Sequence, residues 1–330
     1  MNSVNSFYRT GQQALWITEK LFATYANPAI LNKWPKKVTV VEVGPRDGLQ
    51  NEPTNIPTST KLNLINKLLD AGVTNLEATS FVSPKWVPQM SDHKEVMLGL
   101  EKRDNVNYIA LVPNVKGLEK ALSCGVKAIA LFIAASESFT RKNINCSIEE
   151  SIVKAKEVMK IASDNGIMVR GYISCVCGCP YEGFTKPQKV AELAKILYEM
   201  KCYEISLGDT IGVGTPGSVT QMLDEVLKVV PADKLAVHFH DTYGQALANI
   251  VTALQMGITV VDSAVGGLGG CPYAKGASGN VATEDLVYML NGMGIQTGID
   301  LNKIVNISHY ICQQLGKQPQ SRVGRALPKL

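Results

Sequence analysis

The sequence has no apolar run long enough to cross a membrane, because stretches such as Ala128–Ala135 stop well short of about 18–20 residues. Aromatic residues are few (6%), and basic residues exceed acidic ones by only four in 330. So small a surplus gives no argument for nucleic-acid binding. At 45% hydrophobic and 19% charged residues, the chain can still bury a large core and is not disordered. We therefore expect a globular protein that binds neither membrane nor nucleic acid.

Cysteine occurs at eight positions, but not in the pattern of a disulfide framework. Such frameworks are typical of short secreted chains, and no secretory leader with an apolar core is present. Reduced thiols in an intracellular compartment are expected. The cluster Cys175-x-Cys177-x-Cys179 lacks the Cys-x2-Cys spacing of a zinc site, and no second pair or histidine follows at the usual distance. We predict no metal or redox role for this cluster, and ordinary roles for His93 and His309.

The charge surplus is concentrated in residues 1–37, which hold five basic residues and one acidic residue, Glu19. The rest of the chain then has 28 of each. The segment is rich in Asn, Ser and Thr, and Ala14–Tyr25 can form an amphipathic helix. These features predict a transit peptide. A plain N-terminal arm packed on the body is the alternative.

Short β-branched runs recur from residue 38 onward, mostly 33–40 residues apart. They are Val38–Val43, Val73–Ser80, Asn107–Pro113, Ala128–Ala134, Met168–Cys175, Cys202–Asp209, Leu235–Asp241 and Thr259–Val265. Helix-period stretches separate most of them: Lys61–Ala71, Ile148–Ser163, Val190–Met200, Ser218–Val230 and Gln245–Met256. Eight such units predict an α/β protein, a (β/α)8 TIM barrel. A doubly wound sheet is the alternative, but no Gly-x-Gly-x-x-Gly follows the first run.

The predicted catalytic barrel spans residues 38–314 and is followed by a C-terminal tail over residues 315–330. We also expect a short additional helical region at the C-terminal end of the barrel. The chain ends Pro328-Lys329-Leu330, which is similar to the peroxisomal address Ser-Lys-Leu, although proline in the first position weakens import. The mitochondrial matrix is the expected location, and the peroxisome and the cytosol are the alternatives.

Polar residues gather where the predicted strands end, which is where a TIM barrel places its active site. Alternate strand residues face the same side, so His238 and His240 both point into the barrel mouth. Asp47 follows strand 1, and strands 1, 7 and 8 adjoin as a group when the barrel closes. Two histidines and a carboxylate can bind a catalytic metal and leave positions open. The alternative is that the histidines only make hydrogen bonds in a polar strand end. Glu77 and Asp209 end two other strands.

A glycine-rich segment follows strand 8, with six glycines among the fifteen residues 266–280. Such a loop can approach a ligand closely and can move as a lid. Cys271 lies within it and could transfer a proton, and the amide oxygen of Asn280 could complete a metal site. A phosphate-binding loop is disfavoured, because no Gly-x-x-x-x-Gly-Lys-Ser/Thr pattern is present. A surface loop with an idle thiol is the other alternative.

Five motifs together resemble the 3-hydroxy-3-methylglutaryl-CoA lyase family, over about residues 38–314. They are VGPRDGLQNE (43–52), SFVSPKWVPQM (80–90), GDTIGVGTP (208–216), HFHDTYGQALAN (238–249) and GLGGCPYA (267–274). The resemblance implies a TIM barrel, a divalent cation (Mg2+ or Mn2+), and cleavage of an acyl-CoA substrate to acetyl-CoA and acetoacetate. This reaction belongs to leucine degradation and ketone-body formation. The resemblance is also compatible with a homodimer.

The same resemblance implies roles for single residues. It gives Asp47, His238, His240 and Asn280 as metal ligands and Cys271 as the catalytic cysteine. Arg46 is expected to bind the substrate carbonyl and stabilise the enolate, while Glu77 and Asp209 shape the site. His238 is the candidate general base, although a metal-bound histidine is a poor base until it leaves the metal.

Two other functions compete with the lyase. A condensing transferase of the same barrel group, similar to isopropylmalate or homocitrate synthase, makes the carbon–carbon bond instead and usually carries an extra C-terminal region. This chain ends soon after the eighth unit, which favours the lyase. A non-catalytic CoA- or metal-binding protein is the second alternative, and the intact set of polar residues argues against it.

Overall fold

The structure is a computed structural model that describes residues 34–270 and 279–327. Most of the predicted transit peptide, the loop cysteine Cys271 and the terminal Pro-Lys-Leu lie outside the described residues.

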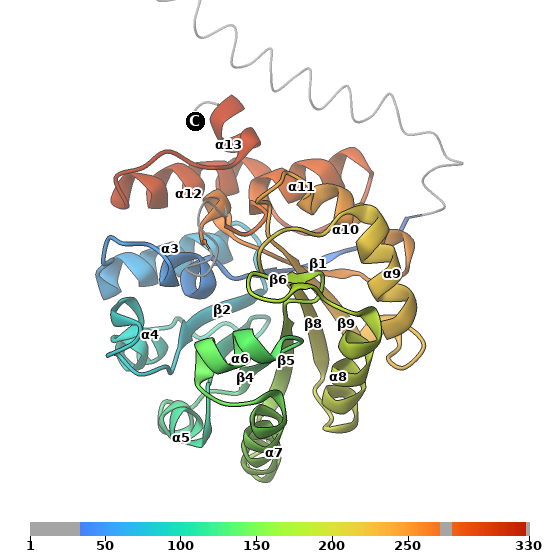
Figure 1. Ribbon diagram of the computed structural model, residues 1–330. Coiled ribbons are helices and arrows are strands. Elements are labelled where there is room, and N and C mark those ends of the chain that lie inside the picture. The colour runs from blue at the N-terminus through green and yellow to red at the C-terminus, as the bar shows by residue number, and fades with distance from the viewer. Residues whose placement is uncertain (1–33, 271–278, 328–330) are drawn as a thin grey trace, which may run out of the picture.

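Eight parallel strands form a closed barrel (Figure 1), in the order β1-β10-β9-β8-β5-β4-β3-β2. They are β1 (Thr39–Glu42), β2 (Asn75–Ser80), β3 (Asn107–Leu111), β4 (Ala128–Ala134), β5 (Met168–Ser174), β8 (Glu204–Asp209), β9 (Leu235–Phe239) and β10 (Val260–Ser263). Each lies within one of the β-branched runs, so the predicted TIM barrel is confirmed and the doubly wound sheet is wrong. A two-stranded hairpin, β6 (Gly178–Cys179) and β7 (Gly183–Phe184), follows β5.

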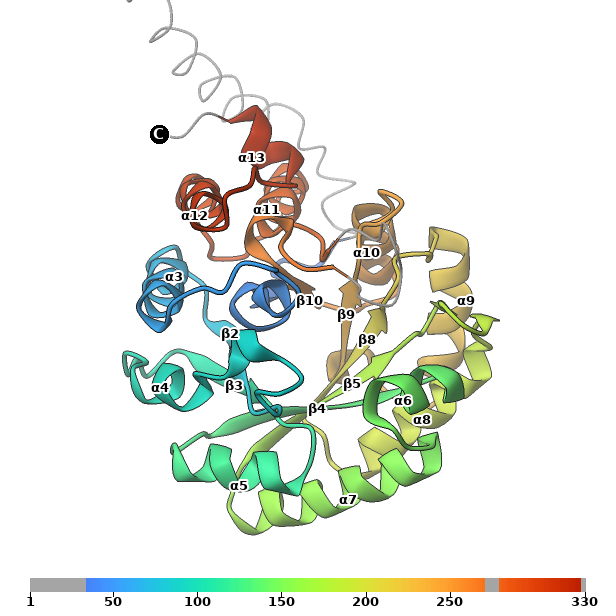
Figure 2. The same ribbon diagram turned by 60° about the vertical axis from the view of Figure 1, so that its left-hand side comes forward.

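Helices surround the barrel in both views (Figures 1 and 2). They are α3 (Thr58–Asp70), α4 (His93–Leu98), α5 (Val115–Ser123), α6 (Glu137–Ile144), α7 (Ile148–Asp164), α8 (Pro187–Glu199), α9 (Pro216–Val226), α10 (Ala246–Gln255) and α11 (Thr283–Gly292). The short turns are η1 (Gly44–Gly48), η2 (Pro88–Met90), η3 (Ala232–Lys234) and η4 (Val265–Gly267). No helix among the described residues is both long and apolar enough to span a membrane.

Gly72 closes the turn that follows α3. Gly72 has φ +101°, in the left-handed region that closes a helix. A Cβ at this position would also collide with the carbonyl oxygen of Gly298. The turn therefore requires glycine for both its backbone conformation and its close packing.

The C-terminal helical region is α12 (Leu301–Gln314) and α13 (Arg322–Ala326). The segment between them returns to the barrel mouth, where the Gln320 amide donates to the Gly266 carbonyl at 3.0 Å. Asp285 on α11 accepts the Ser321 hydroxyl and the amides of Arg322 and Val323 at 2.7–3.0 Å. The described part of the predicted tail therefore packs on the end of the barrel.

The inside of the barrel is polar along part of its length. Residues paired across neighbouring parallel strands share a face, and the register pairs Arg170 with Glu204 and His238 with Asp262. The side chain of Arg170 is fully buried. TIM barrels usually fill this space with branched aliphatic side chains, so buried charged residues inside the barrel are unusual.

Candidate active site

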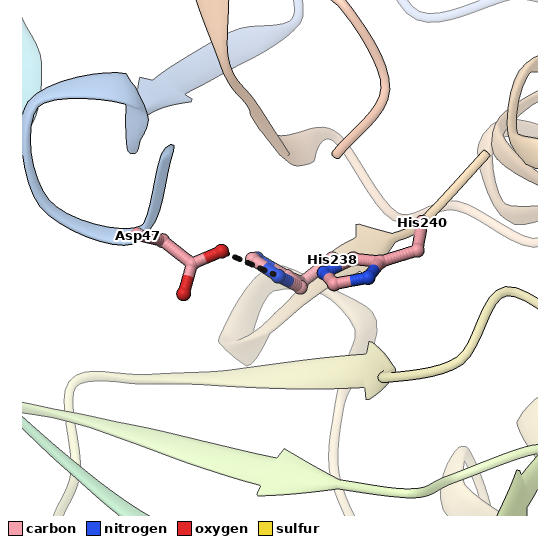
Figure 3. A group of neighbouring side chains, drawn as sticks. All are labelled: Asp47, His238 and His240. Carbon is pink, nitrogen blue, oxygen red and sulfur yellow. Dashed lines mark ion pairs between the residues drawn. The ribbon is translucent and has the colours of Figure 1, made fainter. Parts of the chain in front are cut away.

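Asp47, His238 and His240 meet at the carboxyl end of the barrel (Figure 3). Asp47 is carried by η1, the turn directly after β1, while His238 lies in β9 and His240 just beyond it. One potential ligand atom from each lies within 4.8 Å of the others. The imidazole centroids are 5.3 Å apart. The structure thus brings together the three residues that the strand-end pattern predicts to meet.

The chemistry of these three groups fits a divalent cation. Burial would raise the pKa of Asp47, but Arg46 and the two histidines lower it to about 2, so the carboxylate is charged. Burial, with the neighbouring His238, lowers the pKa of His240 to about 4, which leaves a neutral imidazole with a lone pair. Nδ1 of His240 is buried without a hydrogen-bond partner among the described residues. A carboxylate with neutral imidazoles is a donor set for a catalytic metal.

Asn280 lies beside the three residues. It forms an isolated bridge with His240, and its Nδ2 donates to Asp47 Oδ2 at 2.8 Å and to the Leu268 carbonyl at 3.1 Å. Rotation of the amide by half a turn would give up these two hydrogen bonds and turn its oxygen, a possible metal ligand, toward a cation beside Asp47. The position of Asn280 is therefore compatible with the predicted fourth ligand.

Arg46 is held next to the metal candidates by two carboxylates. Its Nε donates to Glu77 Oε2 at 2.7 Å, and its Nη1 donates to Asp47 Oδ1 at 2.7 Å. Burial opposes the charge on Arg46, but Glu77 and Asp47 more than offset it and raise the pKa of the guanidinium. The result is a fixed cation at the barrel mouth. Glu77 lies in β2, where the pairing with β3 is irregular, and its side chain is fully buried. Its role in the site is therefore to hold the guanidinium of Arg46 in place.

Asp209 supports the site through a loop. Its two oxygens accept the amides of Val213 at 3.2 Å and Gly214 at 2.7 Å, in the connection from β8 to α9. Burial, only partly offset by these bonds, raises the pKa of Asp209 to about 6. A side chain at Gly214 would collide with the same carboxylate, so the loop approaches closely because this residue is glycine.

Sequence reasoning did not identify the contacts of Asp262 and Arg170. Nδ1 of His238 lies 3.1 Å from Asp262 Oδ2, and Arg170 binds both oxygens of that carboxylate. Burial would raise the pKa of Asp262, but Arg170 and His238 lower it well below its usual range. The sequence does contain an indication of this pair, because a charged residue such as Arg170 or Asp262 inside a buried β-strand is costly unless it has a partner of opposite charge.

Two buried acids, Glu42 and Glu284, hold the backbone where the glycine-rich segment begins. Glu42 Oε1 accepts the amides of Gly44 at 2.8 Å and Val265 at 2.9 Å. Glu284 accepts the Gly266 amide at 3.0 Å. Burial, partly offset by hydrogen bonds, raises the pKa of each acid to about 7.

The raised pKa of Glu42 predicts a pH dependence of stability. Below an ordinary carboxyl pKa near 4.5, Glu42 is protonated in both states and its contribution is fully present. As pH rises above 4.5, the Glu42 carboxyl ionises in the unfolded chain but not yet in the folded protein. Its contribution to the unfolding free energy is therefore lost progressively until the folded protein also ionises near pH 7, by up to roughly 3 kcal/mol in total. Glu42→Gln keeps an amide oxygen for the two backbone donors. We expect it to raise the unfolding free energy relative to wild type far more at pH 8 than at pH 5, measured by urea unfolding.

Glu157→Gln, on the exposed face of α7, is the matched control and should leave the difference between the two pH values unchanged. If Glu42→Gln kept the wild-type pH dependence, the raised pKa would be contradicted.

Comparison with known proteins gives one consistent result. Residues 37–311 match the family model described as HMGL-like. The mitochondrial hydroxymethylglutaryl-CoA lyase of Bos taurus is 61% identical over 297 residues, which cover 90% of this chain and 91% of that protein. The cytoplasmic 3-hydroxy-3-methylglutaryl-CoA lyase of Rattus norvegicus is 60% identical over 296 residues, 90% of this chain and 86% of that protein.

Solved structures agree with these sequence matches. The crystal structure of hydroxymethylglutaryl-CoA lyase from Pseudomonas aeruginosa superposes with a TM-score of 0.88 at 55% identity. The match covers 89% of this chain and 98% of that one. The likeness therefore includes the whole barrel and the strand ends that carry the site.

Proposed function

Because the chain belongs to the HMGL-like family, we propose that it is a hydroxymethylglutaryl-CoA lyase that cleaves 3-hydroxy-3-methylglutaryl-CoA to acetyl-CoA and acetoacetate. The observation that carries the proposal is the cluster of Asp47, His238 and His240 with the fixed guanidinium of Arg46 beside it. The relatives at about 60% identity are named lyases, which favours cleavage over a condensing transferase.

The reaction must remove a proton from the tertiary hydroxyl and stabilise negative charge on the thioester oxygen. We propose Mg2+ or Mn2+ as the cofactor, held by Asp47, His238, His240 and Asn280. When bound, such a cation supplies Lewis-acid chemistry that lowers the pKa of a chelated hydroxyl. Arg46 binds the substrate carbonyl and stabilises the enolate, because its charge is already in place where negative charge develops.

The candidate base is His238. Its Nδ1 faces Asp262, so the lone pair available at the barrel mouth is on Nε2, 3.9 Å from Asp47 Oδ2. That lone pair can bind a cation or accept a proton, but not both at once. His238 therefore acts as a base only while it is not a ligand, and Asp262 would then stabilise the imidazolium.

Cys271 is proposed as the acid that protonates the carbanion of acetyl-CoA. The cysteine lies outside the described residues, but described residues on both sides of it are close to the site. Leu268 accepts a hydrogen bond from Asn280, and Gly279 packs against Gly269. The described ends of the glycine-rich segment therefore lie beside the proposed ligands.

Cys271→Ala is expected to lower turnover by about 10²–10⁴-fold, the usual contribution of a general acid, while leaving Mn2+ affinity unchanged. Steady-state kinetics and a Mn2+ titration measure the two quantities. Cys124→Ala, a thiol at the end of α5, is the matched control. Full activity of Cys271→Ala would reject the role of the thiol.

The function is tested by incubating the purified protein with 3-hydroxy-3-methylglutaryl-CoA and Mg2+ and measuring acetoacetate. The expected result is acetoacetate and acetyl-CoA in equal amounts, lost on chelation of the metal. Folded, metal-loaded protein that releases no acetoacetate would overturn the proposal. Incorporation of acetyl-CoA into a longer acid would support the condensing transferase instead.

For the cellular setting, we propose the mitochondrial matrix, with residues 1–37 as a transit peptide, residues 38–314 as the catalytic barrel and 315–330 as the C-terminal tail. Relatives named mitochondrial support this location, and relatives named cytoplasmic support the cytosol as the alternative. The C-terminal Pro-Lys-Leu makes the peroxisome a further alternative. We propose a homodimer as the assembly. Import of a tagged chain with and without residues 1–37 tests the leader.

A further inference from the structure

A buried ion pair crosses the inside of the barrel. Arg170, on β5, donates from Nη2 to Asp262 Oδ1 at 2.7 Å and from Nη1 to Oδ2 at 2.9 Å. Asp262 lies on β10, and neither side chain is exposed to solvent. The hydroxyl of Ser206 donates to the same Oδ2 at 3.0 Å. Two partners from two other strands therefore fix the carboxylate in one orientation.

The remaining contact of this carboxylate is with His238. Nδ1 of His238 lies 3.1 Å from Asp262 Oδ2, and the two residues are direct neighbours in the ladder between β9 and β10. A carboxylate paired to arginine through both oxygens only accepts hydrogen bonds, so the proton must be on Nδ1. The lone pair is then on Nε2, the nitrogen on the side of Asp47.

The two histidines differ in this respect. Nδ1 of His240 is buried without a hydrogen-bond partner among the described residues, whereas Nδ1 of His238 has a dedicated one. A buried ion pair is weak evidence for stability, because its desolvation cost can exceed its Coulomb energy. Branched aliphatic residues would fill the barrel at lower cost. The ion pair of Arg170 and Asp262 orients the ring of His238, which an aliphatic core could not do.

We propose that Asp262 is a positioning residue that fixes His238 in the Nδ1–H tautomer so that Nε2 binds the metal, with Arg170 holding Asp262 in place. The inference rests on the proposed metal-dependent function. Asp262 touches neither the metal nor the substrate and acts through His238 alone. An outer carboxylate of this kind orients the ring and raises the basicity of the ligating nitrogen.

Asp262→Asn tests the proposal through metal affinity. It keeps the size of the side chain but removes the charge, and Mn2+ affinity should fall about 10–100-fold. Glu204→Gln is the matched control, because Glu204 accepts from Nε of the same Arg170 at 2.6 Å and is not hydrogen-bonded to His238. Glu204→Gln should bind Mn2+ as tightly as wild type. Mn2+ titration by electron paramagnetic resonance measures both, with circular dichroism to check folding.

The tautomer can be measured on the wild-type protein, whether or not Asp262→Asn folds. In metal-free protein labelled with 15N-histidine, NMR should show His238 protonated on Nδ1 and bare on Nε2, with its signals identified by their loss in His238→Gln. Protonation on Nε2, or equal weakening of Mn2+ binding by Glu204→Gln, would overturn the positioning role. Failure of the wild type to bind Mn2+ would instead overturn the metal centre itself, so the two failures are distinguishable.

Discussion

Arg46→Met is expected to lower turnover of 3-hydroxy-3-methylglutaryl-CoA by about 10³-fold, at the upper end of the cost of removing one preorganised donor from a developing oxyanion. The guanidinium is bonded to Glu77 and Asp47 before any substrate arrives, so no reorganisation is needed when charge develops. Mn2+ affinity should not fall, because the substitution removes a positive charge next to the cation site. Steady-state kinetics and a Mn2+ titration measure the two effects.

Arg141→Met is the matched control for this experiment. Arg141 is 63% exposed on α6 and pairs with Glu137 four residues earlier, so its loss should leave turnover unchanged. If Arg46→Met lost turnover and metal binding together, Arg46 would be a support for Asp47 and not a catalytic residue. Near-normal turnover would reject both roles.

His240→Ala is expected to weaken Mn2+ binding by more than the about 10–100-fold that loss of an outer-shell partner costs, because it removes a ligand itself. Turnover should fall at ordinary Mg2+ and recover in part when the metal concentration is raised. The fold should tolerate the change, since Nδ1 of His240 has no hydrogen-bond partner among the described residues to leave unpaired. Isothermal titration with Mn2+ and kinetics at several metal concentrations measure these effects.

His309→Ala provides the matched histidine control. His309 lies on α12, outside the barrel, and belongs to none of the proposed roles. Its substitution should leave Mn2+ affinity unchanged. Equal Mn2+ affinity in His240→Ala and wild type would remove His240 from the ligand set, and the metal centre would have to be rebuilt around Asp47 and Asn280.

Local patterns predicted most of the fold. The β-branched runs mark all eight barrel strands, because strands of a parallel barrel are buried on both faces and read as continuous apolar segments. The meeting of Asp47 with the two histidines also followed from rules of this kind. Strand alternation puts His238 and His240 on one face, and barrel closure brings the end of the first strand next to them.

The partners of these residues were not predictable in the same way. Arg170 and Asp262 are 92 residues apart, and their contact depends on the register of strands that face each other across the barrel. Asp209 was expected to shape the site, but its actual contacts are the loop amides of Val213 and Gly214. Both kinds of contact depend on side-chain direction, which the sequence pattern does not specify.

The sequence by itself determined the number and order of the barrel strands, the strand ends where the candidate site lies and, through its motifs, the family. These properties follow from local hydrophobic periodicity and from residue type. Only the tertiary structure decided which nitrogen of His238 faces Asp262, which carboxylates fix Arg46, and where the C-terminal segment packs. Those properties depend on side-chain directions and on distances between elements that are far apart in the sequence, which exist only once the barrel has closed.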